Sequence, residues 1–378
     1  MQVPGFCVNA SAARYRARRG QPLVPAAFAC QAGEASPRGR HRDPDGKIKS
    51  VTPRAVRFLG TAVRYFVNAV NLARQQEGWG SAVATGVILS TQEARKIPRF
   101  LHLRWKQRGQ RLPRPPSAAT ILDVSEVLRQ LAEVEVDLQV DTLDRDAFVR
   151  HMSAFPYPRF YAGGPVASGG LREAKILEYF VSLCLLPVGQ PDIVIDIASE
   201  RSVFPTMIAR TVGASVFRQD LAYPIGVNGD RIGGSADKMP VPNEFADKLF
   251  LHNSFEHFEG DIDTSFIYEA SRVLKPGGGA CIVPLYLSIR HLNMTDPLVD
   301  TRGVVWDADA EIVQRVGHHV RFGRFYSART LATRVLEPAH ECGFQTDIYH
   351  FTGVDPGSDD PISRAQGGIR FAMVLRKR

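Results

Sequence analysis

The chain has 378 residues and a net charge of +8 at pH 7, a length that suits one large α/β domain of about 200 residues with an extension, or two domains. The charge is uneven, because residues 1–115 hold 21 Lys and Arg against 5 Asp and Glu, and residues 116–378 hold 26 against 34. No apolar run approaches the roughly 20 residues that a membrane-spanning helix needs. The five cysteines are scattered without a CxxC pair, which argues against a metal knuckle or a disulfide framework and indicates the reduced thiols of a cytoplasmic protein.

The first 50 residues are predicted to be a disordered basic tail. Residues 1–33 contain no acidic residue and include the basic run "RYRARR". Organelle transit peptides have a similar composition, so a transit peptide is the alternative interpretation of this segment.

Residues 51–115 are predicted to form a basic helical extension. Within 53–76 the polar and apolar side chains recur at spacings of three and four, the pattern of an amphipathic helix. A second basic run with Trp105 among its charges follows. The helix is expected either to dock on the acidic remainder of the chain or to make a peripheral membrane contact through residues 53–111. Nucleic acid is the least favoured partner, because no recognisable binding module accompanies the basic residues.

The stretch "LPRPPSAA" at 112–119 is predicted to be a linker, since proline resists both helix interiors and central strands. Residues 116–171 are predicted to form a helical lead-in to the main domain. Thr142 is the expected N-cap of the second helix in this segment, with Asp144 and Asp146 where the helix dipole favours negative charge. A Gly-rich, aromatic loop, "YPRFYAGGPVASGG", ends the lead-in and is expected to cap a cofactor.

Residues 192–206, "DIVIDIASERSVFPT", are predicted to form a strand, a turn and the start of a helix. The strand is short and β-branched, as is typical of a strand buried on both faces. A second predicted strand leads to Asp220, 24 residues beyond Asp196. Nucleotide-binding α/β folds place a carboxylate at such a strand end to accept hydrogen bonds from ribose hydroxyls.

Residues 233–288 contain "SADKMPVP", a predicted strand at 247–251, "FEHF", a helix ending in "RVLKPGG", and a predicted strand at 280–285, in that order. This ordered set closely resembles the second half of the class I S-adenosylmethionine-dependent methyltransferases, in particular those with a type 11-like domain. The resemblance covers roughly residues 172–378. It implies an α/β fold with a Rossmann-like seven-stranded sheet and helices on both faces, to which the basic helical extension is added.

Individual elements of this pattern have physical reasons. In "RVLKPGG", Pro276 is expected to stop the helix, while Gly277 and Gly278 are expected to supply the positive φ of the reversal into a strand. "RTLATRVLEPAHECGF" is predicted to be a helix that stops near Gly343, and "QTDIYHF" and "GGIRFAMVLRK" are predicted to be the closing hairpin of that family. Residues 286–326 are rich in Tyr, Trp, His and Arg and are the expected substrate lid, since loops carry specificity on a fixed scaffold.

The resemblance implies S-adenosylmethionine as cofactor and methyl transfer as activity, and O-methylation of a small molecule or glycan is the expected reaction. The alternatives are a catalytically degenerate methyltransferase-fold binding module and a nicotinamide-dependent oxidoreductase, which is disfavoured by the absence of G-x-G-x-x-G. No metal is expected, because the cationic sulfonium is already activated and the enzyme mainly supplies alignment. A metal site built from nearby side chains is the least favoured interpretation; it would use His252, Glu256, His257 and Glu259.

The family usually has a glycine-rich turn after the first strand, whereas this chain has "IASERS", whose small residues allow a near approach. Ser235 stands where the family usually has an acid that meets the adenine amino group, and Asp237 is the alternative. The residues implied to bind the cofactor are Asp196, Ala198, Ser199, Ser202, Asp220, Leu221, Ser235, Ala236, Asp237 and Asn253.

Three titratable residues follow the predicted fourth strand, where the transferable methyl group is expected to lie. The imidazole of His252 or His257 can accept a proton from a substrate hydroxyl near neutral pH. The competing interpretation is that the Glu256–His257 pair positions the chain, as is common in the family. The expected catalytic residues are His257, His252 and Glu256.

Overall fold

The computed structural model describes residues 13–15, 123–136, 138–157, 171–199, 202–296, 299–315, 320–352 and 369–378. The basic helical extension predicted at 51–115 lies outside them, as do residues 158–170 of the predicted capping loop. Within the predicted N-terminal tail, Ala13–Tyr15 forms strand β1. In the part of the chain that is described, no helix is long and apolar enough to cross a membrane.

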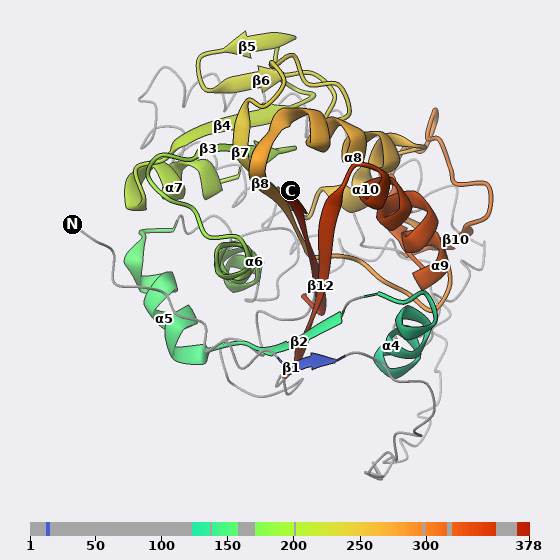
Figure 1. The fold of residues 1–378 in the computed structure, drawn as a ribbon. Helices are drawn as coiled ribbons and strands as arrows, with labels where there is room; N and C mark the ends of the chain where they lie inside the picture. Colours follow the sequence, from blue (N-terminus) through green and yellow to red (C-terminus); the bar gives the residue numbers. More distant parts are fainter. Residues whose placement is uncertain are drawn as a thin grey trace, which may run out of the picture.

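A large twisted sheet forms the centre of the molecule (Figure 1). Its order, over the described residues, is β1-β2-β12-β13-β8-β7-β3-β4-β6-β5. Only β13 runs antiparallel to its neighbours between β6 and β12, so the predicted Rossmann-like seven-stranded sheet is confirmed. Its strands are β6 (Arg231–Gly233), β4 (Ser215–Asp220), β3 (Ile193–Ile197), β7 (Ala246–His252), β8 (Leu274–Val283), β13 (Phe371–Lys377) and β12 (Phe344–Thr352).

The sheet extends beyond these seven strands at both edges. Strand β5 (Gly226–Asn228) pairs antiparallel with β6. At the other edge, β2 (Leu138–Thr142) pairs parallel with β12, and β1 pairs antiparallel with β2. Strand β2 was not predicted, since only helices were expected in the lead-in. The N-terminal side of the described chain is therefore joined to the sheet by backbone hydrogen bonds.

The helix that follows β2 begins later than predicted. Thr142 still belongs to β2, opposite Thr352 of β12, so its prediction as an N-cap is wrong. The N-cap of α5 (Arg145–Ala154) is Asp144, whose side chain accepts a hydrogen bond from Ala147 N at 2.9 Å. Such a cap satisfies one of the unpaired N–H groups of the first helical turn.

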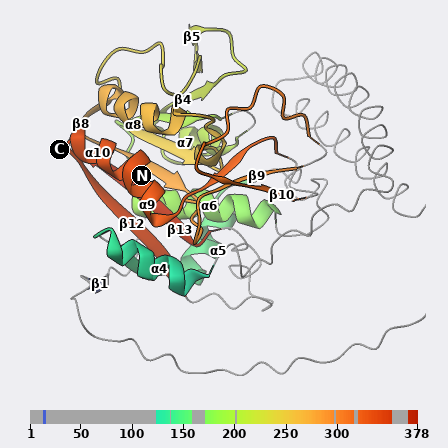
Figure 2. The same cartoon turned by 90° about the vertical axis from the view of Figure 1, so that its right-hand side faces the viewer.

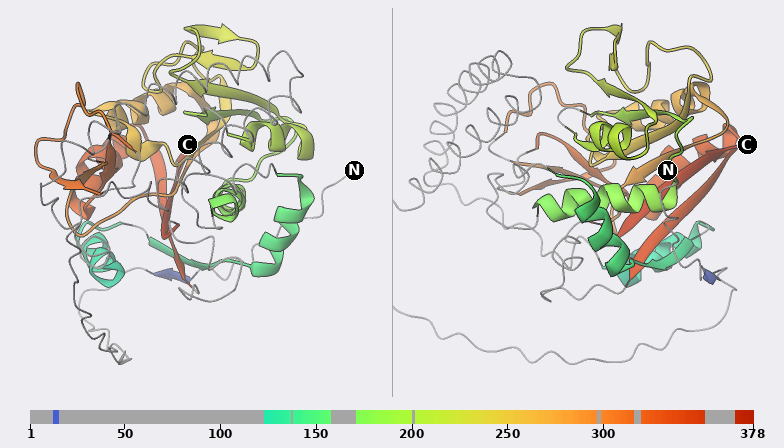
Figure 3. Two further views of the ribbon diagram at one scale, coloured as in Figure 1. Left: turned by 180° about the vertical axis from the view of Figure 1, so that it is seen from behind. Right: turned by 90° about the vertical axis from the view of Figure 1, so that its left-hand side faces the viewer.

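Helices cover both faces of the sheet, as predicted (Figures 1 and 3). Side chains alternate along a strand, so Val194 of β3 packs into one layer while Ile195 and Ile197 pack into the other. The first layer contains α5, α6 (Leu171–Leu185) and α7 (Phe204–Thr211). The second contains α4 (Val124–Glu133), α8 (Ile262–Val273) and a helical segment at 328–341. Each large apolar side chain fully buried between the layers contributes about 1.5–3 kcal/mol.

The reversal from α8 into β8 differs from the prediction in two details. The helix ends at Val273 and Leu274 is already extended with ψ 136°, so Pro276 does not stop it. Gly277 has φ 77°, as expected, but Gly278 is not among the glycines with positive φ. Crowding requires the second glycine instead, because a Cβ there would lie 2.8 Å from the backbone oxygen of Asp247.

The predicted C-terminal helix changes its winding along its length. It consists of α9 (Ala328–Leu331), the π-helical segment η3 (Ala332–Leu336) and α10 (Glu337–Glu341). Pro338 has no N–H to donate to the carbonyl of Arg334, four residues earlier. The Thr264 hydroxyl of α8 donates to that carbonyl at 2.9 Å. Gly343 follows with φ 74°, consistent with the predicted end of the helix.

The predicted lid region at 286–326 contains a small sheet of its own. Strands β9 (Leu292–Thr295), β10 (Glu311–Gln314) and β11 (Gly323–Phe325) pair in the order β10-β9-β11. Figure 2 shows β9 and β10 side by side, on the side of the molecule away from the C-terminus. The insert after β8 is thus a folded unit built on the main sheet.

Candidate functional site

The predicted cofactor residues gather at one edge of the sheet. Asp196 lies near the carboxyl end of β3, Asp220 ends β4, and His252 ends β7. These strands are parallel and β3 pairs with both of the others, so their carboxyl ends share one edge. Ligands of open α/β sheets bind at this edge.

The turn after β3 adopts a glycine-like backbone without glycine. Ala198 has φ 52°, in the left-handed region that L residues other than glycine seldom occupy. The side-chain oxygen of buried Gln219 accepts from Ala198 N at 3.0 Å, and its backbone oxygen accepts from Ser199 N at 2.8 Å. The Gln219 amide also donates to Gly234 O at 2.6 Å. Gln219 therefore ties the turn after β3 to the loop after β6.

The two serines of this turn have different surroundings. The Ser202 hydroxyl accepts from Phe204 N at 3.2 Å and lies 3.3 Å from the Tyr179 hydroxyl, so it is occupied at the start of α7. The Ser199 hydroxyl is buried and has no hydrogen-bond partner among the described residues. Of the two hydroxyls, only that of Ser199 lacks a partner among the residues that the structure describes.

Asp220 and Leu221 lie together at the end of β4. The Asp220 carboxylate accepts from Ala222 N at 2.8 Å and is only partly buried, so it is accessible to a ribose. Leu221 is 73% exposed, which leaves an apolar side chain beside that carboxylate.

The loop after β6 joins the two candidates for the adenine contact. Ser235 Oγ donates a short hydrogen bond to Asp237 Oδ1, so the two residues form one polar unit, with Ala236 buried between them. Helix α8 contacts this loop, since Glu269 accepts a hydrogen bond from Met239 N at 2.6 Å.

His252 points into the helical layer formed by α6 and α7. Its Nδ1 lies 3.3 Å from Asp196 Oδ1, and its Nε2 lies 3.0 Å from Ser182 Oγ. Its ring packs against Tyr179 and Phe204, with centroid distances of 4.9 and 4.6 Å. The structure thus brings His252 and Asp196 together in a buried pair.

Asn253 connects α6 to the insert. It has φ 51°; its Nδ2 donates a short hydrogen bond to Glu178 Oε1, and its Oδ1 accepts from the Tyr286 hydroxyl at 2.6 Å. Glu178 is buried and also accepts from Lys175 Nζ at 2.9 Å. Sequence reasoning missed Glu178 and Tyr286, because a glutamate on an amphipathic helix and a tyrosine in an aromatic insert carry no distinguishing signal.

Glu256 and His257 lie in the short helix η2 (Phe255–His257). The Nδ1 of His257 is 2.7 Å from Phe322 O. A carbonyl only accepts hydrogen bonds, so Nδ1 carries the proton and the neutral ring has an unprotonated Nε2. This Nε2 lies 3.6 Å from Glu256 Oε1, and the His257 side chain is 39% exposed.

Burial raises the pKa values of the neighbouring groups. Glu256 is buried, its Oε2 has no hydrogen-bond partner among the described residues, and burial raises its pKa. Burial, with the charges of Glu256 and Glu178, also raises the pKa of Tyr286 well above its ordinary value. The Tyr286 hydroxyl therefore stays protonated as a donor.

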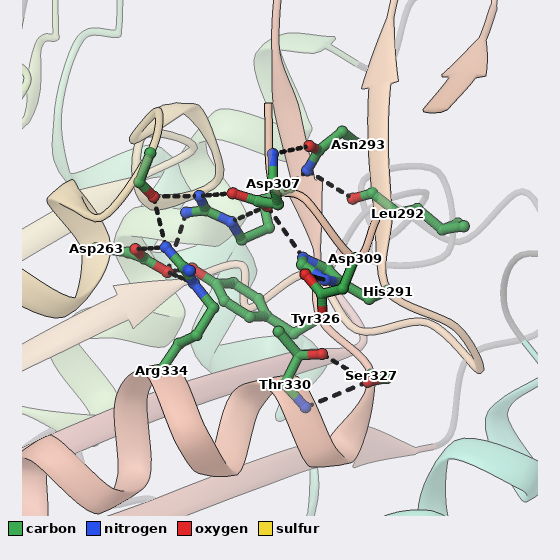
Figure 4. Close-up of polar contacts among 12 residues, drawn as sticks. Asp263, His291, Leu292, Asn293, Asp307, Asp309, Tyr326, Ser327, Thr330 and Arg334 are labelled. Atoms are coloured by element: carbon green, nitrogen blue, oxygen red, sulfur yellow. Dashed lines mark hydrogen bonds and ion pairs between the residues drawn. The ribbon is translucent and has the colours of Figure 1, made fainter. Parts of the chain in front are cut away.

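A second buried cluster anchors the insert to the loop that carries Glu256 and His257. Arg324 of β11 lies 2.6 Å from Asp307 and 2.9 Å from Asp263 of α8, and it donates to Phe258 O at 2.7 Å. Arg334 approaches Asp263 at 2.6 Å from the C-terminal helical segment. Figure 4 shows Asp263, Asp307 and Arg334 converging from separate elements. The described residues include no group of three or more His, Cys, Asp or Glu side chains placed to hold a metal ion.

Comparison with known proteins gives one family match, over residues 208–282, to the family model described as "Methyltransferase domain". No curated protein matches the chain. Similar solved structures include a Burkholderia thailandensis 1,6-didemethyltoxoflavin-N1-methyltransferase with bound 1,6-didemethyltoxoflavin and S-adenosylhomocysteine, at 15% identity over 54% of this chain and 78% of that chain, with a TM-score of 0.33. Another is a geranyl diphosphate methyltransferase in complex with GPP and sinefungin, at 12% identity over 59% and 84%, with a TM-score of 0.35.

The matched segment lies within the region predicted to be the methyltransferase domain, and the central sheet has the strand order of that fold. Both findings support the predicted class I S-adenosylmethionine-dependent methyltransferase domain, with S-adenosylmethionine as its cofactor.

Proposed function

We propose that the chain is an S-adenosylmethionine-dependent O-methyltransferase that acts on a hydroxyl of a small molecule or glycan. The observation that carries the proposal is the His257 imidazole, which offers an unprotonated Nε2 at the carboxyl edge of the sheet. When bound, S-adenosylmethionine supplies a methyl group already activated by the sulfonium. The chain then has to bind, align and deprotonate the acceptor.

The residues at the edge of the sheet fit such a cofactor. Asp196 Oδ2 and Ser199 Oγ are buried and without hydrogen-bond partners in the described part of the chain, and a buried polar atom without a partner is costly. The amino-acid part of the cofactor would supply partners for both. Asp220, at the adjacent strand end, would accept hydrogen bonds from the ribose hydroxyls.

In this proposal His257 is the general base. An alcohol loses its proton as its oxygen is methylated, and Nε2 is free to accept that proton because Phe322 O holds Nδ1 as the protonated nitrogen. Glu256, 3.6 Å from Nε2, would stabilise the imidazolium that forms. Glu178 and Tyr286, which interact electrostatically with Glu256 and are bonded to Asn253, are proposed to line the acceptor site.

A catalytically degenerate binding module is the second candidate, and the turn after β3 favours it. Ala198 occupies a left-handed backbone without the glycine that the family usually has there, and its Cβ reduces the space for a cofactor. This candidate keeps the fold and gives up methyl transfer.

Two measurements separate these candidates. Isothermal titration with S-adenosylmethionine and S-adenosylhomocysteine is expected to show binding of both, and a folded sample that binds neither leaves only the degenerate module. Transfer of a radiolabelled methyl group to a panel of phenols, alcohols and sugars is expected to fall about 10²- to 10⁴-fold in His257→Gln. Exposed His340, far along the chain in α10, is the matched control, and His340→Gln is expected to keep full activity.

Residues 53–111, outside the described part of the chain, are proposed to hold a cytoplasmic enzyme against anionic membrane. Each Lys or Arg near such a surface contributes about 1 kcal/mol. Co-sedimentation with anionic vesicles that disappears in high salt and on deletion of residues 1–115 supports this proposal. Equal absence of binding to anionic and neutral vesicles, with loss of solubility on the same deletion, shows instead that the segment docks on the fold.

A further inference from the structure

Three side chains from three elements form a buried hydrogen-bonded line beneath the cofactor edge. Ser182 Oγ of α6 lies 3.0 Å from His252 Nε2, and His252 Nδ1 lies 3.3 Å from Asp196 Oδ1 of β3. All three connect the helical layer to the end of the first central strand.

The arrangement has the order of a Ser-His-Asp triad, but it lacks access. Ser182 is 0% exposed and lies within a helix, so its hydroxyl cannot reach the carbonyl of a substrate, which nucleophilic catalysis requires. A hydrolytic role is therefore excluded for this line. A structural consequence remains, since the line fixes the carboxylate of Asp196.

The donors and acceptors around Asp196 determine how its carboxylate is oriented. An ionised Asp196 can only accept, so His252 Nδ1 carries a proton toward Oδ1. Nε2 faces Ser182 Oγ, and the Ser182 hydroxyl donates its proton to Tyr179 O at 3.0 Å. The aromatic rings of Tyr179 and Phe204 against His252 leave the imidazole little freedom to turn away. Oδ1 is thereby engaged and Oδ2 is left without a partner in the described residues.

We infer that His252, held by Ser182, positions Asp196 so that Oδ2 binds the ammonium group of the amino-acid part of S-adenosylmethionine. This inference rests on the proposed function. It assigns His252 a role in holding the cofactor, where the sequence suggested a catalytic base. It also separates the cofactor site into an amino-acid part, which depends on His252, and an adenosine part, which depends on Asp220.

The test compares two ligands that differ only in the part in question. S-adenosylhomocysteine carries the ammonium group, whereas 5′-methylthioadenosine has the adenosine and thioether without the amino acid. His252→Phe keeps an aromatic ring in the packed site and removes both hydrogen bonds. In isothermal titration this variant is expected to bind S-adenosylhomocysteine on the order of ten- to a hundredfold more weakly, the range for a hydrogen bond to a charged group. Its affinity for 5′-methylthioadenosine is expected to be unchanged.

Three further variants make the comparison specific. His252→Asn places an amide nitrogen as many bonds from Cα as Nδ1 and is expected to restore most of the affinity for S-adenosylhomocysteine. Ser182→Ala, which removes the smallest side chain of the line, is expected to weaken this ligand by about two- to tenfold. Asp220→Ala is the control for the adenosine part and is expected to lower the affinity for both ligands.

The outcomes are distinguishable. Failure of the wild-type protein to bind S-adenosylhomocysteine overturns the proposed function and this inference with it. Binding by the wild type that is unchanged in His252→Phe and Ser182→Ala overturns the inference alone. Equal losses for both ligands in folded His252 variants, checked by thermal unfolding, also overturn it, since they indicate general damage to the site.

Discussion

At the scale of single residues, the backbone of Ala198 has a measurable cost. Its φ of 52° places the Cβ near the following carbonyl oxygen, which disfavours every residue except glycine. Ala198→Gly is therefore expected to raise the free energy of unfolding by about 1 kcal/mol, measured by urea denaturation. Ala214, which is buried and has no positive φ, is the matched site, and Ala214→Gly is expected to destabilise the protein.

The buried His151 makes stability depend on pH. Burial lowers the pKa of His151 to about 4, below its ordinary value near 6.5, while the ring stays 2.8 Å from the Tyr157 hydroxyl. As the pH falls, the unfolded chain therefore takes up a proton on His151 at a higher pH than the folded protein does. The contribution of neutral His151 to the free energy of unfolding is fully present above about pH 6.5 and is lost as the pH falls toward 4.

Urea denaturation at pH 7.5 and pH 5 measures this effect. The His151 contribution to the free energy of unfolding is expected to fall by about 2 kcal/mol between the two. His151→Gln has no such proton and is expected to lose less stability on acidification, whereas the exposed His340→Gln is expected to follow the wild type. Parallel curves for wild type and His151→Gln would contradict the assignment.

Sequence motifs predicted the residues at the edge of the candidate site, but they did not predict the residues that support them. Asp220 and "FEHF" stand at spacings that the sequence reveals, because a strand end and a family pattern fix them. Gln219, Glu178 and Tyr286 take part through tertiary contacts. A polar residue within a strand or helix shows its partner only after the chain has folded, so no local pattern could identify these three.

At the scale of elements, the π-helical segment η3 depends on a bond from another helix. The Thr264 hydroxyl donates to Arg334 O, which Pro338 cannot serve. Thr264→Val keeps the size of the side chain and removes this donor, so it is expected to lower the free energy of unfolding by about 1–3 kcal/mol. The measurement is thermal or urea unfolding.

The exposed Thr333 provides the comparison for this prediction. Its hydroxyl donates to Arg329 O at 3.3 Å on the solvent side of the same helical segment, where water can replace it. Thr333→Val is expected to change stability by less than about 0.5 kcal/mol. A loss as large as that of Thr264→Val would show that valine weakens the helix regardless of the carbonyl.

Strands β3, β7, β8 and β13 were predictable because each contains a short, continuous apolar run between turn signals. Strand β2 was missed for a physical reason: "LQVDT" is half polar, short, and follows a strongly amphipathic helix. An edge strand takes its conformation from its neighbour, here β12, and a sequence window of a few residues cannot contain that partner.

At the scale of the whole molecule, Arg324 joins the insert to the main domain through buried charges. Arg324→Met leaves Asp307 buried without its arginine, while Asp263 keeps Arg334, and is expected to cost about 3–5 kcal/mol of unfolding free energy. Arg302, 84% exposed and paired with Asp300, is the matched control. Arg302→Met is expected to cost less than about 1 kcal/mol.

The same cluster predicts a response to acid. Burial acts to raise the pKa of Asp307, but hydrogen bonds from Arg324, His291 and Asn293 outweigh it and lower that pKa. The contribution of ionised Asp307 to the free energy of unfolding is therefore fully present above the pKa of an unfolded aspartate, about 3.9. It is lost as the pH falls below that value. Unfolding of the wild type between pH 5 and pH 3 is expected to show this loss, and Arg324→Met is expected to lack it.

The pairing of β2 with β12 also bears on how the protein forms during synthesis. The hydroxyls of Thr142 and Thr352, at the ends of these strands, lie 3.3 Å apart but are separated by 210 residues in the chain. The ribosome releases β2 long before β12, at about 5–20 residues per second, so β2 waits on the order of ten seconds or more for this partner. This edge of the sheet can close only when β12 and β13 have emerged, so it is among the last parts of the described fold to form.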